Sequence, residues 1–113
     1  MAMEYVPERG DMVWIAPDFK PGGERHGRWP VLVLSPAAYN AKVGRAILCP
    51  LITQTKRQPF EVRIPAGMGF QGAILADQVM SLEWRERAPE LIGRLPGLTM
   101  DEVLAKLGAL LGR

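Results

Sequence analysis

The sequence has very few of the residues on which disulfide frameworks and metal centres depend. Its 113 residues include one cysteine, Cys49, and one histidine, His26. A single cysteine excludes a disulfide within the chain, and one thiol with one imidazole is too small a set for a usual zinc site. A phosphate loop of the G-x-x-x-x-G-K-[ST] type and the H-E-x-x-H motif are also absent. We therefore expect no metal ion and no other cofactor, and we expect Cys49 to be a small core residue.

Long apolar stretches are missing as well. No run approaches the roughly 18 apolar residues of a membrane-spanning helix, and the N-terminus carries Glu4, Glu8 and Arg9 where a signal peptide would need a basic start and an apolar run. We expect a cytoplasmic protein with no membrane partner. A chain of 113 residues with 48% hydrophobic content suits one compact domain, and we assign residues 1–113 to it.

Positive charge is concentrated in two segments. The net charge is only +2, but residues 20–28 and 53–63 each carry three basic residues against one glutamate, whereas residues 1–19 are acidic. A mildly basic chain of this kind permits a nucleic-acid partner without requiring one.

Ten prolines and twelve glycines cut the chain into short apolar segments, which is typical of strands joined by tight loops. The pattern predicts strands at 11–16, 31–34, 45–53, 60–64, 73–79 and 91–95, and a short helical turn at 37–42. The capping box of Thr99 and Glu102, followed by leucines at helical spacing, predicts one C-terminal amphipathic helix. We predict a mainly β fold, a small bent antiparallel barrel or half-barrel with this helix packed against it.

The densest polar cluster is the glycine-rich segment 20–30, which holds Glu24, Arg25, His26 and Arg28 beside Trp29. Cleavage of RNA without a metal needs a base, a cation and an acid, and these side chains supply candidates for each role. A solvated turn explains the same composition. Trp29 either stacks an unpaired base or packs in the core, and the sequence favours the core slightly.

A second polar run, residues 53–58, joins two predicted strands. Its hydroxyls, amides and cations suit phosphates and base edges, although a plain hairpin connection explains them equally well.

Motifs spread along almost the whole chain resemble the MazF branch of the PemK-like toxins. They include Tyr5-Val6-Pro7, Gly10-Asp11, Val33-Leu34-Ser35-Pro36, Tyr39-Asn40, Thr53-Gln54, Pro59-Phe60-Glu61-Val62 and Leu75-Ala76-Asp77-Gln78-Val79. The resemblance implies an SH3-like barrel of the PemK/CcdB type with a terminal helix, and a homodimer that binds single-stranded RNA. It also implies metal-independent cleavage of mRNA to 2′,3′-cyclic phosphate and 5′-hydroxyl ends, and a MazE-like antitoxin that covers the same surface with an acidic tail. We expect Trp14, Trp84 and the apolar strands to support dimerisation.

Two positions depart from the family pattern. The family keeps an arginine where this chain has Trp29, and a threonine where it has Ile52. Three explanations stay open: Arg28 and Thr53 act after a shift of one residue, His26 takes over acid/base duty, or the protein binds an antitoxin or another protein target without cutting RNA. The candidate catalytic residues are Glu24, His26, Arg28 and Thr53, and the candidate RNA-binding residues are Arg25, Trp29, Gln54, Lys56, Arg57, Asp77 and Gln78.

Overall fold

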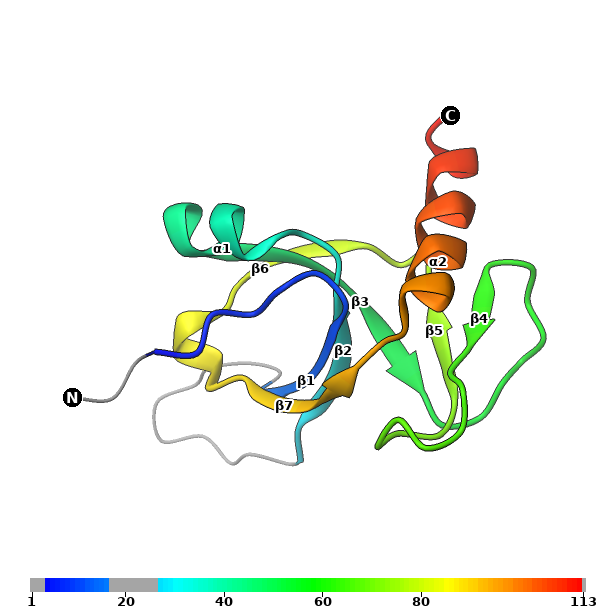
Figure 1. Ribbon diagram of the computed structural model, residues 1–113, viewed down its shortest axis with the longest axis horizontal. Coiled ribbons are helices and arrows are strands. Elements are labelled where there is room, and N and C mark those ends of the chain that lie inside the picture. Colours follow the sequence, from blue (N-terminus) through cyan, green and yellow to red (C-terminus); the bar gives the residue numbers. More distant parts are fainter. Residues whose placement is uncertain (1–3, 17–26, 113) are drawn as a thin grey trace.

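The computed structural model describes residues 4–16 and 27–112, which form a strongly curled antiparallel sheet with a helix after its last strand (Figure 1). The strands are β1 (Asp11–Ile15), β2 (Trp29–Val33), β3 (Arg45–Ile52), β4 (Glu61–Arg63), β5 (Ala73–Leu75), β6 (Met80–Glu83) and β7 (Glu90–Arg94). The helices are α1 (Ala37–Val43), the 3₁₀ turn η1 (Arg85–Arg87) and α2 (Gly97–Leu110). The strand order is β4-β5-β3-β2-β1-β7, with β6 beside β3. This architecture confirms the predicted mainly β half-barrel with a C-terminal helix.

Both faces of the central strands are buried, which explains why their sequences are continuous apolar runs. Alternate residues of β2 enter different clusters: Leu32 packs with Cys49, Ile74 and Met100, whereas its neighbour Val31 packs with other residues on the opposite face. That opposite cluster consists of Val13, Ile15, Val31, Val33, Ala46, Leu48 and Trp84. Cys49 is fully buried, as predicted. A curled sheet provides two such interiors within one short chain.

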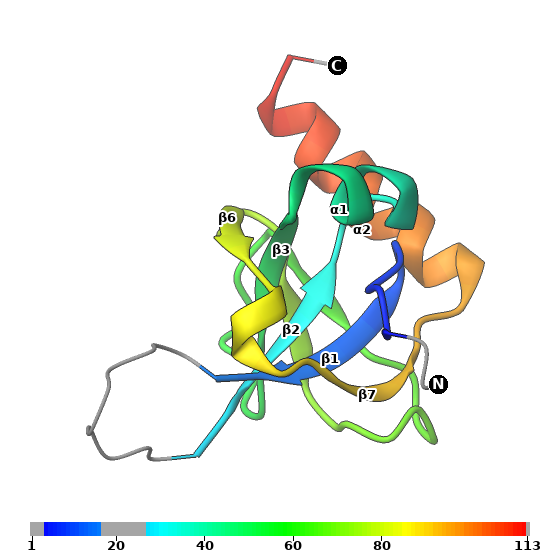
Figure 2. The same ribbon diagram turned by 90° about the vertical axis from the view of Figure 1, so that its left-hand side faces the viewer.

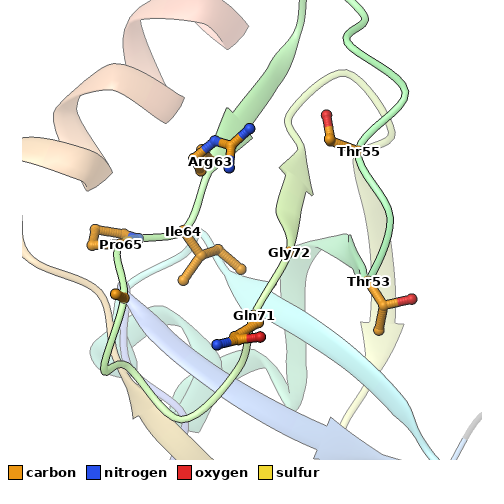
Figure 3. A pocket seen from close by; sticks show the side chains of 8 residues that line it. Thr53, Thr55, Arg63, Ile64, Pro65, Gln71 and Gly72 are labelled. Atoms are coloured by element: carbon orange, nitrogen blue, oxygen red, sulfur yellow. The ribbon is translucent and has the colours of Figure 1, made fainter.

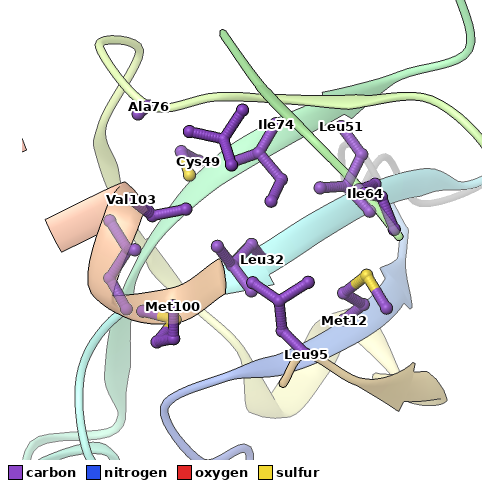
Figure 4. Packing of buried hydrophobic residues seen from close by; sticks show 12 residues of the cluster. Met12, Leu32, Cys49, Leu51, Ile64, Ile74, Ala76, Leu95, Met100 and Val103 are labelled. Atoms are coloured by element: carbon purple, nitrogen blue, oxygen red, sulfur yellow. The ribbon is translucent and has the colours of Figure 1, made fainter. Parts of the chain in front are cut away.

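Helix α2 covers the buried cluster that contains Leu32 and Cys49. Figure 4 shows Met100 and Val103 reaching from the helix toward the strands, and both side chains are buried. The helix begins at Gly97, with Pro96 at its N-cap and no side-chain cap. The predicted Thr99–Glu102 capping box is therefore wrong, because Thr99 already lies in the first turn. Leu110 and Leu111 are also exposed, so the apolar contact of the helix ends earlier than its leucine spacing suggested.

Only the first part of the segment predicted as one strand at 73–79 is a strand in the structure. β5 ends at Leu75, a turn closes with the Gln78 amide donating to the Leu75 carbonyl, and β6 then pairs with β3. The turn separates Asp77 and Gln78 from the ladder and leaves both side chains exposed.

The buried side chain of Asn40 and the hydrogen bond from Trp84 connect α1 to the residue that follows β6, on the side of the sheet where the Val31 cluster lies. The Asn40 side chain donates to the Pro7 and Ser35 carbonyls, and the Trp84 indole donates to the Asn40 carbonyl at 3.0 Å. Trp84 is only 2% exposed. The expectation that it supports dimerisation is wrong, because its surface is used within the chain.

The two helices lie on the same side of strands β1, β2 and β7 in both views (Figure 1, Figure 2). Within residues 4–16 and 27–112, no helix is long and apolar enough to cross a membrane.

Candidate functional site

The glycine-rich segment that the sequence singled out falls mostly outside the described residues. Glu24, Arg25 and His26 belong to the part that the structure does not describe, so their catalytic and RNA-binding roles stay predictions. The described chain resumes at Gly27. Arg28 follows it, and β2 begins at the next residue, Trp29.

Arg28 is held by groups of the neighbouring strands β1 and β7. Its Nη1 donates to Glu90 Oε1 at 2.6 Å, and its Nη2 donates to the carbonyl oxygen of Ala88 and, at 3.4 Å, to that of Trp14. With Ala16, Gly27 and Ala88 it lines a hollow of about 380 Å³. Since β1 and β3 flank β2 on opposite sides, Arg28 points away from the end of β3, where Thr53 lies. The structure does not bring these two candidates together.

Trp29 is exposed to 43%, so the slight preference for core packing was wrong. It lines a hollow of about 270 Å³ whose other walls are apolar residues of β2, β3 and the start of β6: Pro30, Val31, Pro50, Leu51 and Met80. An exposed indole above an apolar hollow is suited to contact with a flat base.

Thr53 opens a different hollow, of about 400 Å³, at the far end of the sheet (Figure 3). Its lining residues are Thr53, Thr55, Arg63, Ile64, Pro65, Ala66, Gln71 and Gly72. Gly72 allows the start of β5 to approach β3 closely, because a Cβ atom there would stand 1.8 Å from the Ile52 carbonyl oxygen. Its φ of +152° also lies in a region that side-chain-bearing residues rarely adopt.

A third group of candidates shares one further hollow of about 330 Å³. It is lined by Ile52, Lys56, Gln58, Pro59, Phe60, Glu61, Leu75, Asp77 and Gln78. Lys56, Asp77 and Gln78 thus come together from two separate segments, whereas Gln54 and Arg57 lie exposed on the same loop without lining it. A cation, a carboxylate and amides in one hollow offer the donors and acceptors that single-stranded bases present on their edges.

Glu61 anchors the loop between these two hollows. Thr55 Oγ1 donates to its carboxylate at 2.5 Å, and the backbone amides of Lys56 and Arg57 donate to it at 3.0 and 3.1 Å. The Thr55 hydroxyl first, and these amides with it, lower the pKa of Glu61 below its ordinary value. Thr55 lines the Thr53 hollow and Glu61 lines the Lys56 hollow, so their hydrogen bond joins the two.

A family profile described as the PemK-like, MazF-like toxin of type II toxin-antitoxin systems matches residues 8–111. The chain belongs to this toxin family.

Relatives of this MazF-like toxin match it over nearly its full length. The chain is 39% identical over 112 residues to the Endoribonuclease toxin MazF of Escherichia coli K12, covering 99% of this chain and 100% of that protein. It is 28% identical to Endoribonuclease PemK of Escherichia coli, over 92% of this chain and 81% of PemK. A crystal structure of MazF from Deinococcus radiodurans has a TM-score of 0.85 at 45% identity, covering 97% of this chain and 100% of that chain. A MazE-MazF structure from the same organism has a TM-score of 0.86 at 44% identity, covering 97% of this chain and 100% of that chain.

The two departures from the MazF pattern both line surface hollows. Trp29 lies over the apolar hollow, and Ile52 contributes to the one that holds Lys56, Asp77 and Gln78. Five polar residues that line the Thr53 hollow or the Lys56 hollow were absent from the predicted site: Thr55, Gln58, Glu61, Arg63 and Gln71. Thr55 and Gln58 stand in the polar run 53–58 of the sequence. Glu61 stands in the Pro59–Val62 motif and Arg63 in the second basic segment, so both carried a sequence signal, whereas Gln71 carried none.

Proposed function

We propose that this MazF-like chain is the toxin of a type II toxin–antitoxin system and cleaves single-stranded RNA, chiefly mRNA, at specific sequences without a metal ion. The observation that carries the proposal is its 39% identity, over 99% of its length, to a relative named as an endoribonuclease toxin. The exposed hollows around Trp29, Thr53 and Lys56 are suited to the three parts of an RNA strand: bases, phosphates and base edges.

The chemistry needs only side chains that this chain possesses. The 2′-oxygen attacks phosphorus, the bond from phosphorus to the 5′-oxygen breaks, and the products carry a 2′,3′-cyclic phosphate and a 5′-hydroxyl. We assign removal of the 2′-hydroxyl proton to Glu24 or His26, and protonation of the leaving 5′-oxygen to His26. Arg28 and Thr53, which line different hollows, are alternative candidates for the group that stabilises the charged phosphorane.

Arg28 must exchange a partner to act on phosphate. The side chains of Arg28 and Glu90 are 37% and 66% exposed, and ion pairs this exposed contribute about 1 kcal/mol or less. An RNA phosphate is therefore able to replace the Glu90 carboxylate at small cost.

For partners, we propose a homodimer that pairs with a MazE-like antitoxin in the cytoplasm. Solved MazE-MazF structures of a 44–45% identical relative support the antitoxin. Leu98, at 85% exposure, and Leu111, at 73%, leave apolar surface on α2 for such contacts. Light scattering should give twice the chain mass of 12.5 kDa, and a mass of one chain at micromolar concentration would argue against the dimer.

The decisive experiment is incubation of the purified protein with long single-stranded RNA in EDTA, followed by sequencing of the new 5′ ends. We expect 5′-hydroxyl ends at one short recurring sequence. A variant that carries both Glu24→Gln and His26→Ala, purified in the same way, controls for contaminating nucleases and should leave the RNA intact. RNA that stays intact with a stoichiometric amount of the unmodified protein would overturn the proposal and favour a toxin that acts on a protein target.

A further inference from the structure

Arg63 is an exposed cation without a partner among the residues that the structure describes. The side chains of most described arginines are engaged, as Arg45 is with Ser81 and Arg94 with Asp11. Among residues 4–16 and 27–112, only Arg57 and Arg63 have a guanidinium that makes no hydrogen bond, ion pair or ring contact with another described residue. Arg57 already belongs to the predicted RNA-binding set. Arg63 has no assigned role.

Strand pairing places Arg63 beside the hollow that Thr53 opens. Arg63 on β4 pairs with Ala73 on β5, and Ala73 pairs with Ile52 on β3, so the three side chains share one face of the sheet. Ile52 directly precedes Thr53, so this row brings Arg63 to the end of β3 from which Thr53 follows. Figure 3 shows Arg63 on one wall of the hollow and Thr53 on the other, with the backbone of Gly72 between them.

The free groups in this hollow fit an anion. A guanidinium binds phosphate oxygens through two parallel N–H groups, and it does so best when no carboxylate competes. The Thr53 hydroxyl and the Gln71 amide have no partner among the described residues and are available to donate. The Thr55 hydroxyl is different, because its proton is committed to Glu61. A hollow of about 400 Å³ is ample for one phosphate group.

We propose that Arg63, with Thr53 and Gln71, forms a phosphate-binding subsite that positions the RNA strand. This inference rests on the proposed function, since it names a further contact to the same RNA. The adjoining hollow supports an RNA ligand, because the carboxylates of Glu61 and Asp77 and the amide of Gln78 can accept hydrogen bonds from base amines.

The test measures binding separately from cleavage. A fluorescein-labelled single-stranded 2′-O-methyl oligonucleotide with all four bases in random order cannot form a cyclic phosphate, so it reports binding alone. We expect Arg63→Ala to weaken its binding about tenfold, as loss of a hydrogen bond to a charged group does. The plot of log K against log salt should become shallower by about 0.7, the value for one phosphate contact on a single strand. Arg63→Lys should restore the salt slope because it retains the charge.

Lys42→Ala is the matched control. Lys42 is an exposed cation on α1 without a described partner and away from every hollow named above, so its removal changes the net charge equally. Its salt slope should equal that of the unmodified protein. Arg63→Gln repeats the measurement with a longer polar side chain, and thermal melting verifies that each variant is folded.

Two results would overturn the subsite. One is a salt slope for Arg63→Ala and Arg63→Gln equal to that of the Lys42 control. The other is an unchanged affinity for the oligonucleotide together with reduced binding of poly-glutamate, which would assign Arg63 to an acidic peptide. Failure of the proposed function is a separate observation, because it appears as intact RNA in the cleavage assay whether or not the oligonucleotide binds through Arg63.

Discussion

Arg28, which directly precedes the central strand β2, and Arg63, on the edge strand β4, differ in what surrounds their guanidinium groups. Arg28 is held by the Glu90 carboxylate and two backbone carbonyls beside β1 and β7. Arg63 lies on β4, three strands further along the sheet order, with no described partner. Arg28 must give up its contact with Glu90 before it binds phosphate, whereas Arg63 can bind phosphate without losing a described contact.

This difference separates two uses of positive charge. A paired arginine stabilises the segment that carries it and contributes little to the field around the protein, because its carboxylate cancels the charge at a distance. An unpaired arginine contributes nothing to folding through its charge but attracts anions. The three predictions below test this contrast, starting with the largest expected effect.

Gly72→Ala should damage the Arg63 end of the sheet most. The new Cβ atom would stand 1.8 Å from the Ile52 carbonyl oxygen, and alanine would be strained at this positive φ. The steric overlap and the backbone strain together should lower the free energy of unfolding by about 4 kcal/mol. Urea denaturation measures the loss. Gly67→Ala is the control, since Gly67 has a φ of +85° but nothing within 4 Å, and should lose only about 1–2 kcal/mol. Equal losses in the two variants would show that β5 can move away from β3.

Arg28→Ala should raise the barrier to RNA cleavage by about 3 kcal/mol, as loss of a group that stabilises the transition state does. Single-turnover cleavage rates measure this effect. Glu90→Gln leaves the guanidinium in place and removes only its charged partner, so it should cleave at the original rate and lose less than about 1 kcal/mol of stability. An Arg28→Ala variant with an unchanged rate and reduced stability would make Arg28 a structural residue only.

The smallest effect is expected at the loop between the two hollows. The pKa of Glu61 is lowered by the Thr55 hydroxyl and the amides of residues 56 and 57. A carboxylate with a lowered pKa stabilises the folded loop fully above the ordinary glutamate pKa, and this contribution is lost as the pH falls through the lowered value. Hydrogen-exchange protection of the Lys56 and Arg57 amides should therefore decline in acid relative to that of the buried Val62. Glu61→Gln should remove the pH dependence of this protection. If the dependence persists in the variant, the Glu61 carboxylate does not hold the loop.

Much of the fold could be predicted because its signals are local. Proline and glycine punctuation located most of the strands, and leucine spacing located α2. The start of α2 could not be predicted, because Thr99 and Glu102 match a capping pattern while the burial of Met100 and Val103 sets where the helix packs. β6 was missed because its residues are only partly buried and follow Val79 without a proline or glycine.

The candidate site was harder to predict because it depends on strand pairing. Lys56, Asp77 and Gln78 were chosen separately and share a hollow. Arg63 was counted only as part of a basic segment, since its place in a row with Ala73 and Ile52 follows from two pairings between strands. Arg28 and Thr53 were chosen as candidates because they neighbour the two substituted positions, but their side chains line different hollows.

Cys49 has a practical consequence for labelling. It is the only thiol of the chain, it is fully buried between strands, and burial raises its pKa to about 12. The thiolate is the form that attacks maleimides, so the Cys49 side chain of the folded protein should not react with them at neutral pH. A second cysteine placed on the surface, for example by Lys42→Cys, can then carry a single dye while Cys49 stays in place, and an energy-transfer pair can follow RNA as it reaches the sheet.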